Sequence, residues 1–490
     1  MEVKLVTQRK SIKQNIAYQT FYEILAIILP LITSPYISRI IGAEGLGIFS
    51  FTYSIAYYFQ IFGMLGIKFY GNRLIAQVRE DQDKTNVAYS EVLVLHILFS
   101  VASTVIYLIY SIFLSQYVVY SLLQSIMVIA TVFDVSWLFF GLEEFKTTVL
   151  RNTIIKLVSV LAIFLFVHNR NDLWVYILIM ASSQLFGNLM LFKMAKRYVT
   201  FIFPKWESIR LHIKPMLILF IPVISLSLFK YMDKIMLGLI GDKIELGYYE
   251  NAEKILNIPL GVILSCGSVM MPKIANLMAK NDQKSVNKYI HLSIKYMSSI
   301  AIAMAFGMAA IAQTFAPLFW GKEFIECGYL IMLLAISLPF STISNIVRNQ
   351  DLIPNGKDRG YGIAIIFGAL LNLIINYTLI PTLQSTGVCV GTIISEIVVC
   401  IAQFFWADKK IDYRHYILEA LVYFFPGVIM YTCVRFIGKI LGASILSLIC
   451  QCFIGIVVYS LLTLIYFFIQ KDEVILGASD TLKKFLLKNR

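Results

Sequence analysis

The chain has 490 residues, of which 59% are hydrophobic and 14% are charged, and its mean hydropathy is +0.76. A soluble globular chain carries about a quarter charged residues, so this composition excludes a soluble protein and indicates an integral membrane protein. The net charge of +13 would suit a nucleic-acid partner, but the basic residues gather in loops on one side, as membrane topology requires.

About fourteen apolar runs follow one another along the chain, most of them long enough for a helix to cross a bilayer. They are continuous rather than alternating, which favours an all-α fold over a closed β-barrel. The runs lie at residues 16–41, 46–66, 87–114, 117–140, 153–168, 173–193, 215–240, 247–271, 292–318, 326–347, 361–381, 386–407, 416–436 and 443–469. The basic start leads into a full-length run with no small-residue cleavage site, so we expect no removable signal peptide.

The loops between these runs predict the orientation. With the N-terminus inside, the inner loops collect roughly thirty Lys and Arg against about five outside. The richest inner loop is 193–214, which contains six basic residues. Both termini are therefore expected in the cytoplasm.

An internal repeat divides the chain. Residues 40–49, IIGAEGLGIF, are echoed at 239–248 by LIGDKIELGY. The offset places span 7 on span 1, so each copy holds six spans and the repeats are parallel. We predict an N-lobe at 1–214, a C-lobe at 215–410, and two extra C-terminal helices with a basic tail at 411–490. A repeat of this kind in a membrane chain is typical of a transporter.

The glycines of the two echoed turns are expected to have a structural role. They allow tight turns and close approach of helices rather than contact with a ligand. These glycines are Gly42, Gly45, Gly47, Gly241 and Gly247.

Four segments together resemble the oligosaccharide flippase (Wzx-type) branch of the MOP (MATE-like) superfamily: residues 34–73, 134–146, 151–156 and 369–396. The resemblance implies a V-shaped pair of six-helix lobes in a bacterial cytoplasmic membrane. It also implies alternating-access transfer of undecaprenyl-pyrophosphate-linked oligosaccharide units from the inner to the outer leaflet, for O-antigen, capsule or another surface polysaccharide. Fourteen spans instead of twelve is shared with the related lipid II flippases, which leaves a lipid II-type transporter as an alternative.

A group of charges in spans 7 and 8 forms the candidate binding site, because ionisable residues inside spans usually face a cavity or a partner. Lys230, Asp233 and Lys234 share one helix face. With Lys254 and with Arg39 of span 1, the two lysines could form a cationic cleft for a pyrophosphate. Glu250 and Asn257 would be polar partners. The alternative is a set of internal ion pairs, Lys234 with Glu250 or Asp233 with Lys254.

Further polar and aromatic residues in the spans have two readings each. Tyr53 and Tyr57, one turn apart, either pack or stack on sugar rings in the cleft. Glu23, Asp134 and Glu396 are either structural carboxyls or the titrating group that couples transport to a proton or sodium gradient.

Other function classes fit less well. A multidrug cation extruder of the same superfamily would favour an acidic cavity. A polysaccharide polymerase would need a long outer loop for its chemistry, and every outer loop here is about ten residues or shorter. We therefore expect no enzyme, and no cofactor. The five histidines have no i,i+4 pairing and the seven cysteines no C-x-x-C spacing, so we expect no metal site. Lipid-linked oligosaccharide, the bilayer and other polysaccharide assembly proteins, such as a polymerase, are the expected partners.

Overall fold

The computed structural model describes residues 12–471, and every regular element in that range is a helix. The chain divides into two compact units, each described here by itself. Unit 1 contains the described residues up to Glu250 together with Leu373–Val388, and unit 2 contains the rest. The all-α membrane class predicted from the composition is therefore confirmed. The predicted lobe boundaries follow the repeat rather than these units, and they stay a prediction.

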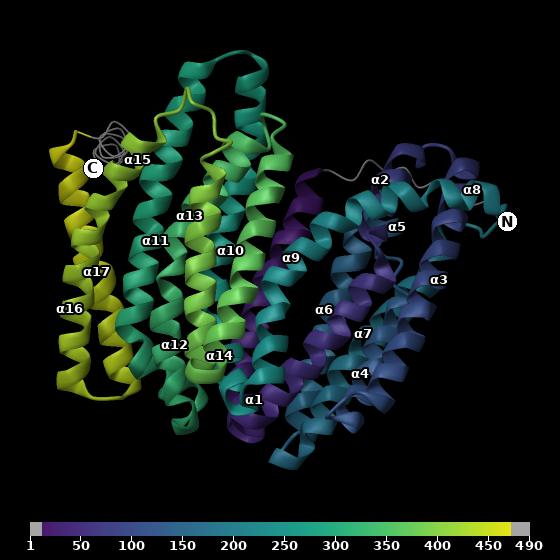
Figure 1. The fold of residues 1–490 in the computed structure, drawn as a ribbon, viewed down its shortest axis with the longest axis horizontal. Helices are drawn as coiled ribbons and strands as arrows, with labels where there is room; N and C mark the ends of the chain where they lie inside the picture. Colours follow the sequence, from purple (N-terminus) through teal and green to yellow (C-terminus); the bar gives the residue numbers. More distant parts are fainter. Residues whose placement is uncertain (1–11, 472–490) are drawn as a thin grey trace, which may run out of the picture. The chain divides into compact units, whose positions relative to one another are not determined.

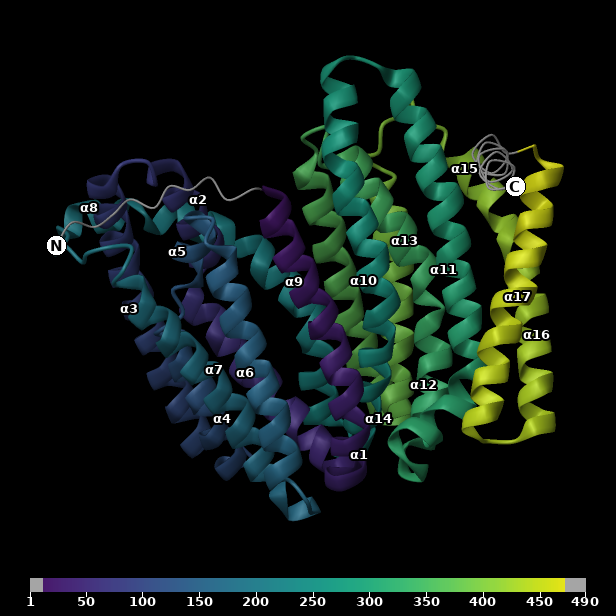
Figure 2. The same ribbon diagram turned by 180° about the vertical axis from the view of Figure 1, so that it is seen from behind.

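Unit 1 is formed by the first nine α-helices, the start of a tenth and a short part of a fourteenth. Its elements are α1 (Ile12–Met64), α2 (Ile67–Val78), α3 (Gln82–Phe113), α4 (Val118–Thr131), α5 (Ser136–Gly141), α6 (Phe145–Phe166), η1 (Arg170–Asp172), α7 (Leu173–Ala195), α8 (Trp206–Leu211), α9 (Ile213–Ile240) and the first turns of α10 (Lys243–Ala279). Figures 1 and 2 both show α2, α5 and α8 at one end of this unit.

Unit 2 is formed by the remaining helices. Its elements are the rest of α10, α11 (Gln283–Trp320), η2 (Lys322–Phe324), α12 (Ile325–Ala335), α13 (Ser337–Val347), the π-helix η3 (Arg348–Leu352), most of α14 (Asp358–Gln403), α15 (Tyr413–Ala420), η4 (Leu421–Tyr423), α16 (Phe424–Leu441) and α17 (Ile445–Ile469). The two extra C-terminal helices, α16 and α17, lie beside α11 (Figures 1 and 2). Tyr459 of α17 donates a hydrogen bond to the Ser299 carbonyl of α11 at 2.7 Å.

Breaks inside two long helices bear on the number of spans. Eleven helices among the described residues are long and apolar enough to cross a membrane, or twelve if the bent pair α12 and α13 forms one span. Gly42 has φ 77° within α1, and Gln384 has φ 49° within α14. Each break falls between two predicted spans. The predicted count of fourteen requires each half of α1 and α14 to cross separately, so it stays a prediction.

Several helices extend beyond the apolar runs that predicted them. α6 begins at Phe145, whereas the fifth run begins at 153, and α10 continues to Ala279 beyond the end of its run at 271. Hydropathy marks only the apolar part of a helix, and polar residues continue the helix beyond it. The fourth predicted span is divided into α4 and α5, because the chain leaves the helix between Thr131 and Ser136.

The repeat is visible in the packing of two equivalent glycines of unit 1. A Cβ on Gly47 would overlap the carbonyl oxygen of Lys243, and a Cβ on Gly247 would overlap the carbonyl oxygen of Ala43. Each glycine thus lets the backbone of the other repeat approach it. The predicted role of these two glycines in close helix approach is confirmed.

The repeat also appears at the start of α3 and α11. Asp81 accepts a hydrogen bond from the Lys84 backbone, and Asp282 accepts one from the Ser285 backbone, both at 3.1 Å. The next residue, a glutamine, donates to an asparagine four residues ahead in each copy, Gln82 to Asn86 and Gln283 to Asn287. These N-caps satisfy backbone donors that the first helical turn leaves open.

Candidate functional site

The charged residues of α9 and the start of α10 lie together inside unit 1. Lys234 Nζ is 2.7 Å from Glu250 Oε2, and Ser50 Oγ donates to the same carboxylate oxygen at 2.7 Å. Lys234 is 7% exposed and Glu250 8%. The predicted pairing of Lys234 with Glu250 is therefore confirmed. Ser50 and Glu250 each follow the glycine of their own repeat, Gly47 or Gly247, by three residues, so this bond joins equivalent positions of the two repeats.

Asp233, the neighbour of Lys234, accepts hydrogen bonds from two neutral side chains. It is 2% exposed and accepts hydrogen bonds from Asn376 Nδ2 at 2.6 Å and from the Tyr249 hydroxyl at 3.1 Å. The sequence did not single out Asn376 or Tyr249, although Asn376 belongs to the asparagine-containing segment 369–396. The predicted pair of Asp233 with Lys254 stays a prediction. Three helices, α9, α10 and α14, supply this group.

An aromatic group adjoins the lysines. The rings of Tyr53 and Tyr57 stack with centroids 6.1 Å apart, and Tyr57 lies 4.1 Å from Tyr231 of α9. The ammonium groups of Lys230 and Lys234 lie 5.6 and 5.7 Å from the Tyr231 centroid, within cation–π range. Tyr231 was not among the site residues predicted from the sequence, although it lies between Lys230 and Lys234. Lys230 itself is exposed.

The other predicted members of the cationic cleft are more dispersed. Arg39 is exposed on the first half of α1 in unit 1. Lys254 is half-buried and Asn257 exposed, and both belong to unit 2. Their membership in one cleft with Lys230 and Lys234 stays a prediction.

The three carboxylates predicted for ion coupling have different surroundings. Asp134 is half-buried at the break between α4 and α5, where its Oδ1 accepts the Ser136 backbone N–H at 3.0 Å. Glu396 is half-buried in α14 of unit 2, with a hydrogen bond to Ser341. The side chain of Glu23 lies outside the described residues. The bond to Ser136 gives Asp134 a local structural contact, and coupling stays a prediction for all three.

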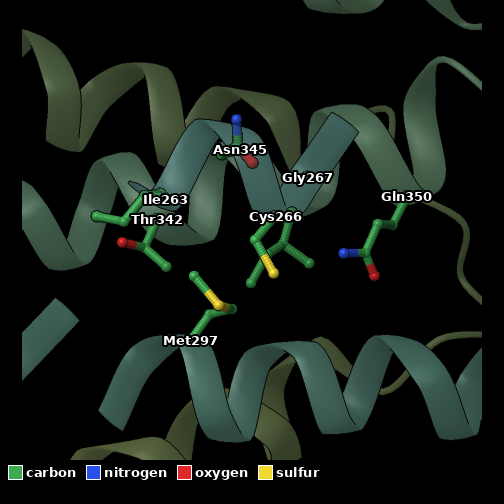
Figure 3. A pocket seen from close by; sticks show the side chains of 8 residues that line it. Ile263, Cys266, Gly267, Met297, Thr342, Asn345 and Gln350 are labelled. Atoms are coloured by element: carbon green, nitrogen blue, oxygen red, sulfur yellow. The ribbon is translucent and has the colours of Figure 1, made fainter. Parts of the chain in front are cut away.

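Unit 2 contains a crevice whose lining includes polar side chains, shown in Figure 3. The crevice is narrow, without room for a water molecule, and lies between α10, α11 and the α13–η3 segment. Cys266 and Met297 point toward one another across it (Figure 3). Both polar atoms of the buried Asn345 amide and the Oε1 of Gln350 have no hydrogen-bond partner within the described chain.

Among the residues that the structure describes, no three His, Cys, Asp or Glu side chains are grouped as metal ligands. The cations at the α9 site are Lys230 and Lys234, each beside the Tyr231 ring. This arrangement suits attraction of an anionic group and contact with a flat apolar face.

Comparison with known proteins yields a family and a fold. The family model described as "Polysaccharide biosynthesis protein" matches residues 12–278. A Shigella dysenteriae protein named "Putative O-antigen transporter" is 22% identical over 377 residues, covering 76% of this chain and 94% of that protein. The Escherichia coli (strain K12) protein of the same name is 22% identical over 368 residues, covering 74% and 88%. The solved structure "Lipid II flippase MurJ, inward closed conformation" has a TM-score of 0.74 at 16% identity, covering 92% of this chain and 99% of that one, which shows a shared fold.

Proposed function

Because the chain belongs to the polysaccharide biosynthesis protein family, we propose that it is a flippase for lipid-linked oligosaccharides. It would carry an oligosaccharide on undecaprenyl pyrophosphate from the inner to the outer leaflet of the bacterial cytoplasmic membrane, by alternating access. Two relatives named as O-antigen transporters support this substrate class. The polymer built from the units would be O-antigen, capsule or another surface polysaccharide.

The observation that carries the proposal is a buried lysine with an aromatic neighbour. A pyrophosphate cannot enter a hydrocarbon environment without compensation of its charge. Lys234 is buried in α9, and Lys230 lies one turn away and is exposed. A flexible ammonium group can follow a moving phosphate, whereas a bidentate guanidinium binds it in one fixed geometry.

Glu250 is the counter-ion of Lys234 when no substrate is bound. Burying a charged group without a counter-ion is costly, and Glu250 supplies that counter-ion at 2.7 Å. An arriving phosphate would compete with Glu250 for Lys234. Glu250 would then keep the hydrogen bond from Ser50, which lowers the cost of losing the lysine. Exchange of one partner for the other allows release as well as binding.

The tyrosines suit the sugar part of the substrate. Tyr53, Tyr57 and Tyr231 form a continuous group of rings beside the two lysines, in which Tyr53 and Tyr57 are half-buried and Tyr231 is buried. The apolar faces of sugar rings can pack on such rings while their hydroxyl groups stay hydrated. Anion and sugar contacts would therefore be adjacent, as a pyrophosphate-linked sugar requires.

The energy source and the protein partners complete the proposal. A proton or sodium gradient would drive the cycle, with Glu23, Asp134 or Glu396 as the titrating group. A polymerase and other assembly proteins would receive the flipped units. Neutral amide replacement of each carboxylate in turn tests the coupling, and full transport by all three variants would remove them from the mechanism.

The test of the function uses a strain in which this gene is the sole source of the flippase. Loss of the protein should leave lipid-linked units on the inner leaflet, where an impermeant lectin added to intact spheroplasts cannot reach them. Lys230→Gln should reproduce part of that accumulation, while Lys284→Gln at an exposed position in the first turn of α11 should not. Unchanged polymer export after deletion of the protein would contradict the proposed function.

A further inference from the structure

The linker between α7 and α9, residues 196–212, exposes large apolar side chains that do not pack against the rest of unit 1. Phe203 is 91% exposed, Leu211 71% and Trp206 58%. Phe201 and Ile202 are exposed as well, and the rings of Phe201 and Phe203 contact each other edge to face at 5.1 Å. Five large apolar side chains in eleven residues form a patch of the kind that marks an interaction surface.

The inner face of the same segment already has its apolar partners. Val199 and Ile209 of the linker, with Met216 of α9, are buried in a core that they share with α2, α3 and α5. The outer apolar residues are therefore not the core-facing side of an amphipathic helix. They are thus available to an occupant from outside unit 1.

Hydrogen bonds fix this surface in place. The Thr200 backbone N–H donates to Asn86 Oδ1 and the Ile202 backbone N–H to Ser90 Oγ, both at 2.9 Å and both on α3. At the other end, His212 Nε2 lies 2.9 Å from Glu91 Oε2. The patch is thus held by α3 at both ends, and ordering it on binding costs little entropy.

The charge around the patch identifies the occupant. Between residues 193 and 214 the chain has six basic residues and one acid, Glu207, and all seven are exposed; the basic ones are Lys193, Lys196, Arg197, Lys205, Arg210 and Lys214. Aromatic residues interleaved with exposed cations are typical of segments in the headgroup layer of an anionic leaflet. The segment joins two membrane-spanning helices, so it starts and ends at the membrane surface.

We propose that the linker 196–212 is an in-plane anchor that binds anionic phospholipids of the leaflet it faces, with Phe203, Trp206 and Leu211 inserted among the lipids. The predicted orientation makes this the cytoplasmic leaflet. Each basic side chain near such a surface contributes about a fivefold preference for anionic lipid. The anchor is independent of what the protein transports, because its residues lie outside the α9 site.

The first test measures whether Trp206 contacts lipid. The full chain is placed in vesicles of brominated phosphatidylcholine, alone or mixed in equal parts with phosphatidylglycerol, and tryptophan quenching is compared with that of Trp206→Phe. The difference in quenching between the parent and Trp206→Phe is the contribution of Trp206. The matched control is Trp174→Phe, which removes a tryptophan at the start of α7, the end away from the linker. We expect quenching of the Trp206 contribution. Its absence in both lipid mixtures, which would point to solvent or a protein partner, would overturn the anchor.

The second test measures lipid selectivity. Lys196, Arg197, Lys205 and Arg210 are replaced together with Gln, and phosphatidylglycerol is titrated while the melting temperature is recorded. We expect the lipid concentration for half of the stabilisation to rise at least fivefold. Replacing Lys280 before α11 together with Lys284 and Lys288 in its first turns should leave it unchanged, because these exposed cations have no exposed large apolar residue among them. Equal shifts in both variants, or none in either, would refute selective binding by the linker.

Discussion

The pair of Lys234 and Glu250 allows a structural role to be separated from a role in transport. Lys234→Gln leaves Glu250 buried, without the ammonium group 2.7 Å away. Removing one partner of a buried pair costs about 3–5 kcal/mol. We expect about 3 kcal/mol, because Ser50 still donates to the carboxylate. That cost corresponds to a factor of roughly 100 in the folding equilibrium, and it should lower the melting temperature of the purified protein.

The double variant Lys234→Gln/Glu250→Gln separates the two roles. Two neutral amides can hydrogen-bond each other, so stability should return to within about 1 kcal/mol of the parent. Transport should not return, because the cation that meets the phosphate is still missing. The assay is thermal melting in detergent together with the amount of polymer exported by cells that contain equal protein. Parental export by the double variant would show that Lys234 only holds the helices together.

Three further changes test the packing of the site. Gly47→Ala places a Cβ against the Lys243 carbonyl oxygen, whereas Gly261 has no atom within 4 Å of an added Cβ. Thermal melting should show that Gly47→Ala destabilises the protein by about 1–3 kcal/mol and that Gly261→Ala does not. Tyr231→Leu should lower transport roughly tenfold by removing two aromatic contacts and the cation–π contacts, while Tyr231→Phe should keep most of the transport. Equal loss of transport in both variants would assign the effect to the hydroxyl. Asn376→Leu should lower the melting temperature more than Tyr249→Phe, because it removes the shorter hydrogen bond to the buried Asp233 (2.6 against 3.1 Å); the reverse order would contradict the assigned contacts.

The part of the site that could be predicted from sequence is the part set by helix periodicity and chain order. Lys230 and Lys234 share a face because of their spacing, and α10 follows α9 directly, so Glu250 could be expected near Lys234. The Ser50 bond and the Asn376 bond to Asp233 join residues 200 and 143 positions apart. Only the packing of helices brings these residues together, and no local pattern in the chain marks them.

The breaks in the long helices show the same limit. Gly42 could be expected to end a helix, since glycine adopts positive φ without strain. Gln384 could not, because its φ of 49° is uncommon for a side chain of that kind. The backbone N–H of Asp242 donates to Gln384 Oε1 at 2.9 Å, and this distant contact stabilises the turn.

The most direct test of the proposed function is leaflet transfer by the purified protein. The chain is reconstituted in liposomes with a fluorescent undecaprenyl-pyrophosphate-linked oligosaccharide, and an impermeant glycosidase added outside reports the fraction of sugar in the outer leaflet over time. Since transfer of the charged headgroup through lipid alone is prohibitive, protein-free liposomes should hold their inner fraction. The account predicts that the parental protein exposes that fraction, and that Lys234→Gln/Glu250→Gln, although folded, does not. An inner fraction that stays protected with the parental protein under every imposed ion gradient would contradict the account.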